Sequence, residues 1–526
     1  MPKFPMDVLA PKLAALFKER WQIQDWNLHF PWWRPPAPCR ILMYVDGAVH
    51  LSGGSFEGLT YVKTLLESRA YPYVHFTVDL CHRDGADPSA TLFAGTPKKL
   101  TELDILDKYD QIWFFGYNEG ASLAPAEVSL MDQFMAAPKY GGVLTTGDHA
   151  SLGQGLSGQI TRVGQMRQYP APDSRFPVWN TTLEQRPPHA GEPADPAPGQ
   201  AYYNFNDQSD DIPQTIRWRS YRVDLFRGRP HPVLCGPDGP IDVLPDHEHE
   251  GEALAPVVTG NAHWPTKGGV QEGPDVIAWG RIKDPTANRH GLEIGVISAY
   301  NGHMVDVGRI VADSTWHHWF DINLIGLTGS GAPYTGFAAT ADGQAALKKI
   351  DAYYLNCGVW LAPPGVQTAM RNAGWWSIVW LNEIVELPAD APLRAVGAVG
   401  IDALGRRAPR CAVFDWVWPK EPIYKPKIPW WEWVQLIPEL PFTNIPVEQY
   451  LAGGILREIT QTFGPTNARR TIGDKPPSDE ALTQARDRGA QKGLEALERD
   501  LGHQNALMTR LVAHKLQPKA VVERER

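Results

Sequence analysis

Apolar runs alternate with helical patterns between residues 39 and 150. The runs "RILMYV", "YVHFTVDL", "QIWFFG" and "GGVLTT" are typical of buried strands. The segments between them carry apolar residues at helical spacing, and in "SFEGLTYVKTLLESR" Ser55 is the expected N-cap. Continuous apolar strands that alternate with helices are typical of a parallel sheet covered on both faces. We therefore predict an α/β domain with a mostly parallel sheet.

The pattern changes after the fourth strand. From about residue 151 to 229 the alternation stops, and "RPPHAGEPADPAPGQ" predicts a surface insertion. Strand-like runs return with "HPVLCG", "PIDVLP", "DVIAWGRI" and "GLEIGVISAY", and Asn301-Gly302 predicts a tight hairpin turn. The predicted parts are an N-terminal helix and Pro/Trp-rich arm (1–38), the α/β domain (39–328), a mainly helical domain (329–425), and a Pro/Trp-rich connector with a long C-terminal helix (426–526).

The composition of the chain limits the partners and the location that we expect for this protein. The net charge of -9, without a run of Lys and Arg, argues against nucleic-acid binding. No apolar stretch reaches the length of a membrane span, so we expect no membrane partner. The five cysteines are scattered, which favours free thiols and a cytoplasmic protein. The 20 tryptophans predict wide aromatic cores or, as the second interpretation, a face that binds a sugar-like small molecule.

The chain from Ser478 onward is predicted to form one long helix with a heptad-like apolar stripe. Its apolar positions are Leu494, Leu497, Leu501, Met508 and Leu511. The stripe docks on the protein's own body in one interpretation, and it pairs with another copy in a homo-oligomer in the other.

Titratable side chains follow several of the predicted strands. Ligands of open parallel sheets bind outside the carboxyl ends of the strands. Asp46 ends the first run, and the candidate catalytic residues come after later strands. These candidates are Glu119, Asp148, His149, His317 and His318. Because they lie on segments far apart in sequence, we expect them to meet at one edge of the sheet.

The segment "DHEHEG" is the candidate metal site. His247 and His249 alternate, which places both rings on one face of an extended segment, a spacing suited to zinc. Asp246 and Glu250 flank them as further ligands. A solvated, charge-rich loop is the other interpretation.

The segment "WHHW" raises a geometric question, because neighbouring residues of a strand point to opposite faces. His317 and His318 reach one site only if the strand has ended at Ser314 or Thr315, and Trp316 and Trp319 are then expected to shield that site from water. A buried structural pair is the other interpretation. Asp148, predicted to lie directly before a helix, is either a site residue or only the N-cap of that helix.

The order of these elements resembles the class I glutamine amidotransferase-like superfamily, and its ThuA-like branch most. The matching segments are "RILMYVDG", "GGVLTTGDHA", "RPHPVL" and "DVIAWGRI…VGRIVADSTWHHWF", within residues 39 to 328. The resemblance implies a flavodoxin-like fold. In the family the strand-to-helix elbow carries a cysteine, but this elbow reads Thr146-Gly147-Asp148-His149-Ala150. Release of ammonia from glutamine by a thiolate is therefore excluded.

Two functions from different classes follow. The first is a hydrolase-type enzyme with a His/Asp-rich site, which binds a divalent metal, zinc foremost, and acts on a small molecule. Glu119 or Glu250 then serves as the base. In a metal-free variant His317 or His318 acts as general acid and base. The second function is that of an amidotransferase-like binding or assembly protein without catalysis.

Overall fold

The computed structural model describes most of the chain and divides it into two compact units. The described residues are 34–47, 49, 58–85, 87, 90–92, 95–118, 122–147, 153–168, 213–222, 228–245, 251–281, 291, 293–326, 336–339, 341–417, 446–464 and 476–515. The first unit contains residues 35–370, and the second contains residues 371–526.

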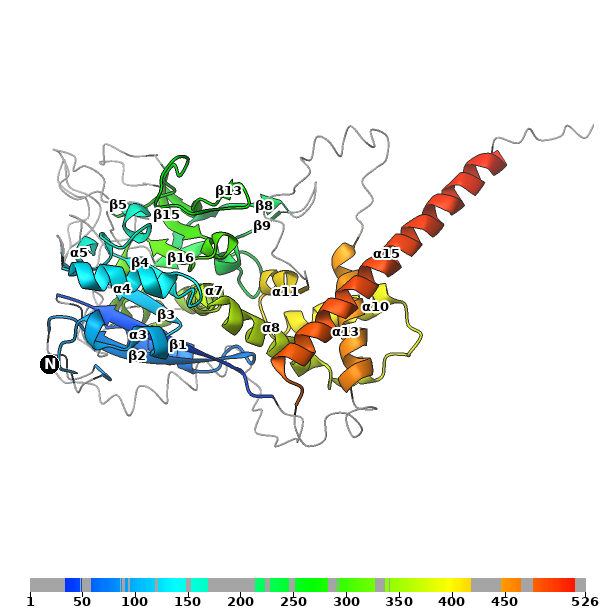
Figure 1. The fold of residues 1–526 in the computed structure, drawn as a ribbon, viewed down its shortest axis with the longest axis horizontal. Helices are drawn as coiled ribbons and strands as arrows, with labels where there is room; N and C mark the ends of the chain where they lie inside the picture. The colour runs from blue at the N-terminus through cyan, green and yellow to red at the C-terminus, as the bar shows by residue number, and fades with distance from the viewer. Residues whose placement is uncertain are drawn as a thin grey trace, which may run out of the picture. The chain divides into compact units, whose positions relative to one another are not determined.

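The first unit is built around an eight-stranded sheet (Figure 1). Five adjacent strands run parallel, and three further strands continue the sheet in antiparallel pairing. The predicted mostly parallel sheet is confirmed. In spatial order the strands are β2 (Val74–His82), β1 (Ala37–Val45), β3 (Gln111–Phe115), β4 (Gly142–Thr146), β16 (Ile310–Asp313), β15 (Glu293–Tyr300), β14 (Asp275–Arg281) and β7 (Arg217–Trp218).

The parallel strands end at a common edge. Val45 pairs with Phe115, and Phe115 pairs with Thr146, so β1, β3 and β4 finish level with one another. On β16, Ala312 pairs with Thr145, which places the end of that strand beside the end of β4. The segments that follow these strands therefore leave the sheet side by side.

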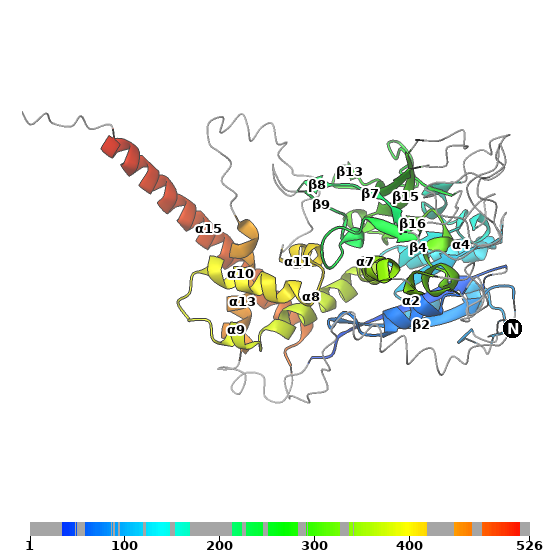
Figure 2. The same ribbon diagram turned by 180° about the vertical axis from the view of Figure 1, so that it is seen from behind.

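Helices cover both faces of the sheet, and Figures 1 and 2 view these faces from opposite sides. The helices α3 (Ile105–Lys108) and α4 (Pro125–Met135) pack on one face. The helices α2 (Thr60–Glu67) and α7 (Ala341–Leu361) pack on the other face, against β2 and β4 respectively. Every residue of β3 is buried, as expected of a strand that packs on both faces.

Three local predictions are wrong. The segment "HPVLCG" forms a short 3-10 helix (Pro232–Leu234), since Pro232 lacks the N–H that a strand ladder needs. The strands β15 and β16 pair antiparallel as predicted, but a 3-10 helix (Gly302–Val305) joins them. Asn301 has φ -87°, whereas a primed turn requires a positive φ.

The third error concerns the start of α2. This helix begins at Thr60 with Leu59 as its N-cap, and the predicted cap, Ser55, lies outside the described residues. Asp321 of α6 (Asp321–Ile325) supplies the missing acceptors, because its two carboxylate oxygens accept the N–H groups of Thr60 and Tyr61. The cap is therefore a tertiary contact.

The second unit is helical, as predicted for the C-terminal part of the chain. Close backbone contacts at glycines pack α10 on α13 and α13 on α15, because a Cβ at Gly397 or at Gly454 would collide with the backbone of the neighbouring helix. The division between the units falls within α8. The helices are α8 (Pro364–Ile378), α9 (Asn382–Val385), α10 (Leu393–Gly405), α11 (Arg410–Val417), α13 (Val447–Phe463) and α15 (Asp479–Lys515).

The cysteines depart from the prediction at one position. Cys39, Cys81 and Cys357 are free and buried. Cys235 is disulfide-bonded, so the expectation of free thiols is wrong for this residue. Disulfides persist mainly in oxidising compartments, and the cytoplasmic location stays a prediction. Among the helices that the structure describes, none is long and apolar enough to cross a membrane.

Candidate functional site

The order of the parallel strands reverses between β1 and β3. The chain passes from β1 to β2 on one side and then returns to form β3 on the other side of β1. In open α/β sheets, ligands bind outside the carboxyl ends of the strands at such a point. We call the residues at these two strand ends, Asp46, Gly47, Tyr117 and Asn118, the switch point.

Asp46 is the central side chain of the switch point. It is fully buried (0% exposed). Its Oδ1 accepts the N–H of Tyr117 at 2.5 Å and the N–H of Asn118 at 3.2 Å, so the end of β3 orients the carboxyl group. Its Oδ2 is buried and accepts no hydrogen bond from any residue that the structure describes. A buried acceptor without a donor is costly and calls for a functional or solvent partner.

Electrostatics make the Asp46 carboxyl group a candidate for proton transfer. Burial raises its pKa, and the nearby charge of Asp84 adds to this effect. The N–H donors of Tyr117 and Asn118 act in the opposite direction without cancelling the shift. Asp84, which follows β2, accepts the N–H of Gly47 and the side-chain amide of Asn118. A raised carboxyl pKa at a strand end is typical of catalytic acids and bases.

Aromatic rings link the switch point to the "WHHW" segment. The Tyr117 ring stacks on Trp316 with centroids 5.3 Å apart, and Trp316 stacks on Phe320 at 5.8 Å. Trp316 is buried, and its Nε1 donates to none of the described residues. Among the described residues, neither Asp46 Oδ2, an acceptor, nor Trp316 Nε1, a donor, has a hydrogen-bond partner.

The loops that carry three predicted site residues begin and end at this edge of the sheet. Gly147, directly before Asp148 and His149, accepts the N–H of Trp316 through its carbonyl oxygen. Asn118, directly before Glu119, accepts the N–H of Gly153. Glu119, Asp148 and His149 themselves lie outside the described residues.

Gly153 lets these two loops meet. Its φ is +90°, and a Cβ there would lie 2.7 Å from the carbonyl oxygen of Thr146 and 2.8 Å from Cα of Gly147. Gly153 is also the N-cap of α5 (Gln154–Ser157), the first described helix after β4. Gly153, and not Asp148, is therefore the N-cap of α5, and the role of Asp148 stays a prediction.

The predicted metal ligands Asp246, His247, His249 and Glu250 also lie outside the described residues, but their flanking strands are placed. The strand β10 (Val243–Pro245) contacts the 3-10 helix Trp316–His318, and β11 (Glu252–Ala253) contacts β16. Gly251 packs so closely on Ser314 that a Cβ would lie 2.0 Å from its carbonyl oxygen. Among the residues that are described, no group of His, Cys, Asp and Glu side chains could hold a metal.

The strand that leads to the two histidines ends at Asp313, as required for both rings to leave the sheet together. His317 and His318 lie in a 3-10 helix (Trp316–His318), and Thr315 is its N-cap, with its hydroxyl accepting the N–H of His317 at 3.1 Å. Both histidines are buried. The strand has therefore ended before the two histidines, which is the condition stated for both rings to reach one site.

The His318 ring belongs to a buried network around Asp313. Its Nδ1 lies 2.6 Å from Asp313 Oδ1. Asp313 Oδ2 accepts the Nε1–H of Trp319 at 2.9 Å and the hydroxyl of Tyr353 at 2.7 Å. Trp319 also packs on Trp113, so it is a core residue and not the predicted shield of a site. Both Asp313 oxygens are satisfied, which favours a structural role.

His317 has a different environment from His318. Its Nδ1 lies 3.4 Å from Asn323 Oδ1, and its ring contacts those of Trp316 and Phe320. Since Trp316 stacks on Tyr117, His317 is the histidine linked to the switch point by ring contacts.

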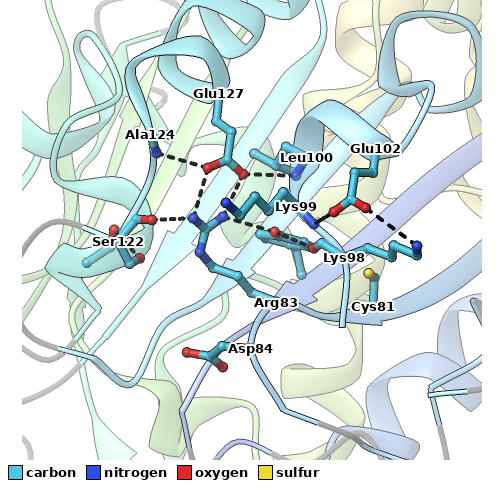
Figure 3. Close-up of polar contacts among 12 residues, drawn as sticks. Cys81, Arg83, Asp84, Lys98, Lys99, Leu100, Glu102, Ser122, Ala124 and Glu127 are labelled. Carbon is cyan, nitrogen blue, oxygen red and sulfur yellow. Dashed lines mark hydrogen bonds and ion pairs between the residues drawn. The ribbon is translucent and has the colours of Figure 1, made fainter. Parts of the chain in front are cut away.

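A buried ion pair fixes the carboxyl end of β2 (Figure 3). Arg83 donates to Glu127 Oε1 at 2.6 Å and to Oε2 at 2.8 Å. Glu127 also accepts the N–H groups of Leu100 and Ala124. Burial raises the pKa of Glu127, but the Arg83 bonds and the backbone donors outweigh this effect and leave it lowered. Every polar atom of Glu127 is used, so the pair is structural.

In the sequence, Asp46 is one of the titratable residues at the ends of the predicted strands, and it has no catalytic role assigned to it. The signal for its role was the reversal of strand order between β1 and β3, which a residue pattern does not contain. Asp46 Oδ2, buried and without a described donor, is the oxygen of this arrangement that could exchange a proton. No family model, curated protein or solved structure matches this chain.

Proposed function

We propose that the chain is a hydrolase-type enzyme that acts on a small polar molecule at the carboxyl edge of its parallel sheet. The observation that carries this proposal is Asp46, a buried carboxyl group with one oxygen held by backbone N–H groups and the other without a described donor. The two hydrogen bonds to Oδ1 fix the orientation of the carboxyl group. Oδ2 therefore points in one fixed direction.

The raised pKa of Asp46 suits general acid and base catalysis, since a carboxyl group that retains its proton nearer neutral pH can both donate and accept one. The predicted catalytic residues Glu119, Asp148 and His149 are on loops whose described ends are hydrogen-bonded at this same edge. His317 is the better candidate of the two histidines, because His318 contacts the satisfied carboxylate of Asp313.

A bound divalent metal would supply the nucleophile for hydrolysis, which is its bound water. His247 and His249, with Asp246 or Glu250, have the donor atoms and the spacing that zinc prefers, and zinc lowers the pKa of a bound water toward neutrality. In support, the strands on either side of this segment contact β16 and the 3-10 helix of the two histidines. The protein's part would be to hold the ion beside Asp46.

The proposed fold family is flavodoxin-like. The parallel strands have the spatial order β2-β1-β3-β4-β16, which corresponds to the 2-1-3-4-5 order of doubly wound flavodoxin-like domains. The resemblance to the class I glutamine amidotransferase-like superfamily stays a prediction, and without an elbow cysteine glutamine hydrolysis is not part of the proposal.

A binding protein without catalysis is the alternative, with a sugar-like molecule as its ligand. The tryptophans that suggested it are explained in part by packing, because Trp113 and Trp319 are core residues that contact each other. The unpaired oxygen of Asp46 fits either function, so activity must discriminate between them.

The test uses the full-length, untagged protein. Zinc content is measured by mass spectrometry, and hydrolysis is measured on a panel of small esters, amides, glycosides and phosphoesters. We expect zinc near one equivalent and hydrolysis of one class, both lost in His247→Ala and His249→Ala. The exposed His503→Ala is the matched control and should change neither.

Hydrolysis that persists without metal would overturn the zinc part and leave the acid and base function of Asp46. The absence of any hydrolysis, together with saturable binding of a saccharide, would favour the alternative.

A further inference from the structure

The C-terminal half of α15 is exposed in the part of the chain that the structure describes. All residues from 498 to 513 are exposed. Of the nine large hydrophobic side chains that are exposed within the described part of the chain, six lie on this helix, and they are Leu494, Leu501, Leu507, Met508, Leu511 and Val512. The exposed apolar surface is thus concentrated on one element, as at protein–protein contacts.

Four of these six residues, together with the half-buried Leu497, have the spacing of a coiled coil. Leu494, Leu501 and Met508 recur every seven residues, and Leu497 and Leu511 lie three residues after the first and the last of them. These positions form one stripe along the helix, which a partner helix can cover. The stripe extends for about 26 Å between residues 494 and 511 at the usual rise of a helix.

The first half of α15 is held firmly by α13. A Cβ at Gly489 would lie 2.5 Å from the carbonyl oxygen of Gly454, and one at Gly493 would lie 2.4 Å from that of Tyr450. This close packing stabilises the first turns of the helix, whose formation is the unfavourable step. The second half then extends an existing helix. A short stripe can therefore associate without also having to fold.

We propose that a second copy of this chain covers the stripe, with the two helices antiparallel. The start of the exposed half carries three acidic residues and one basic residue (Glu495, Glu498, Asp500 and Arg499), and the charged residues toward its end are basic (Arg510 and Lys515). Antiparallel pairing places the acidic part of one helix beside the basic part of the other. Parallel pairing places like charges together, which is unfavourable.

The proposed pair obeys two-fold symmetry, so the same surface serves both copies. Leu494 of one copy lies level with Leu511 of the other, and Leu497 lies level with Met508. The polar Gln504 then pairs with Leu501 near the two-fold axis, where a single polar residue in an apolar seam sets the register.

This inference does not depend on the proposed function. The first experiment is sedimentation equilibrium of the full-length protein. We expect a monomer–dimer equilibrium, and we expect Leu501→Asp with Met508→Asp to raise the dimer Kd by roughly a hundredfold or more, because four apolar positions of the seam become charged. Ala506→Asp with Ala513→Asp is the matched control, since both alanines are exposed on the same helix and are also seven residues apart.

The second experiment determines orientation. Leu494→Cys and Leu511→Cys variants, one of them carrying a mass tag, are mixed and oxidised, with the wild type as background. Antiparallel pairing predicts a cross-link between the two different variants.

A monomer at all concentrations would overturn the proposal, and so would a dimer that is equally stable in the stripe variant. Cross-links formed only between identical variants would show parallel pairing and would overturn the antiparallel arrangement.

Discussion

Two buried carboxyl groups at the ends of parallel strands differ in one respect. Asp313 uses both oxygens, with His318, Trp319 and Tyr353 among its partners. Asp46 uses only Oδ1 among the described residues. Since a satisfied buried carboxylate stabilises its surroundings and an unsatisfied one does not, the first is assigned to structure and the second to function.

Replacement of Asp313 by Asn should destabilise the protein. In one orientation the amide N–H donors would face the indole N–H of Trp319, and in the other they would face the backbone N–H of Thr315, so a buried donor loses its acceptor in either case. We expect the free energy of unfolding of the first unit to fall by roughly 1–3 kcal/mol, the usual cost of leaving a buried polar group unpaired. Urea unfolding followed by tryptophan fluorescence measures it, and an unchanged midpoint would contradict the structural role.

Gly153 makes a second prediction at the scale of a residue. In Gly153→Ala the new Cβ would meet backbone atoms of Thr146 and Gly147, which cannot rotate away, at a φ of +90°. Positive-φ strain of this kind costs about 1–3 kcal/mol, and urea unfolding should show that loss. Gly365→Ala is the control, because nothing lies within 4 Å of its Cβ. Equal effects of the two substitutions would mean that the loops adjust freely.

At the scale of an element, α2 depends on a residue far away in the chain. Asp321 accepts the N–H of Tyr61 across 260 positions of sequence. Burial raises the pKa of Asp321 to about 6, despite the backbone donors that lower it. The folded state therefore keeps a proton that the unfolded chain has already lost.

The pH dependence of stability follows from that shift. The contribution of Asp321 is fully present below pH about 4, where both states are protonated, and it is lost as the pH rises through about 6. Between pH 4 and 7 the free energy of unfolding should fall by roughly 3 kcal/mol more in the wild type than in Asp321→Asn. Urea titrations of both proteins across this range measure the difference, and parallel profiles would contradict it.

Elements with strong local patterns could be predicted from the sequence. The alternation of apolar runs before residue 150 predicted the parallel strands, and the heptad-like spacing of the C-terminal segment predicted α15. Both predictions rest on the spacing of apolar residues within one short segment, which the sequence contains. The cap of α2 and the helix in place of the Asn301-Gly302 turn could not be predicted. Both depend on tertiary contacts, which override local preference.

At the scale of the whole molecule, strand order decides where the site lies. The sequence predicted that charged groups gather at the carboxyl edge, and the described ends of the loops of Glu119 and Asp148 do meet there. It did not single out Asp46, because only the order β2-β1-β3 makes the end of β1 the switch point. The predicted domain boundaries stay predictions.

The replacement of Asp46 by Asn tests the assignment of this residue most directly. A catalytic role and a purely structural role predict opposite changes in stability and in hydrolysis rate. The raised pKa means that the ionised carboxylate weakens the folded state above its folded pKa, so removing the charge should raise the free energy of unfolding at pH 7. Hydrolysis should nevertheless fall by roughly a hundredfold or more, as for the loss of a general acid or base. Asp402→Asn, an exposed control on α10, should change neither quantity.

The decisive measurement is therefore urea unfolding and hydrolysis rate on the same preparations of wild type, Asp46→Asn and Asp402→Asn at pH 7. A variant at Asp46 that is more stable but inactive is the predicted result. A variant that is destabilised and retains its activity per folded molecule would show that Asp46 only supports the fold, and it would contradict the proposed site.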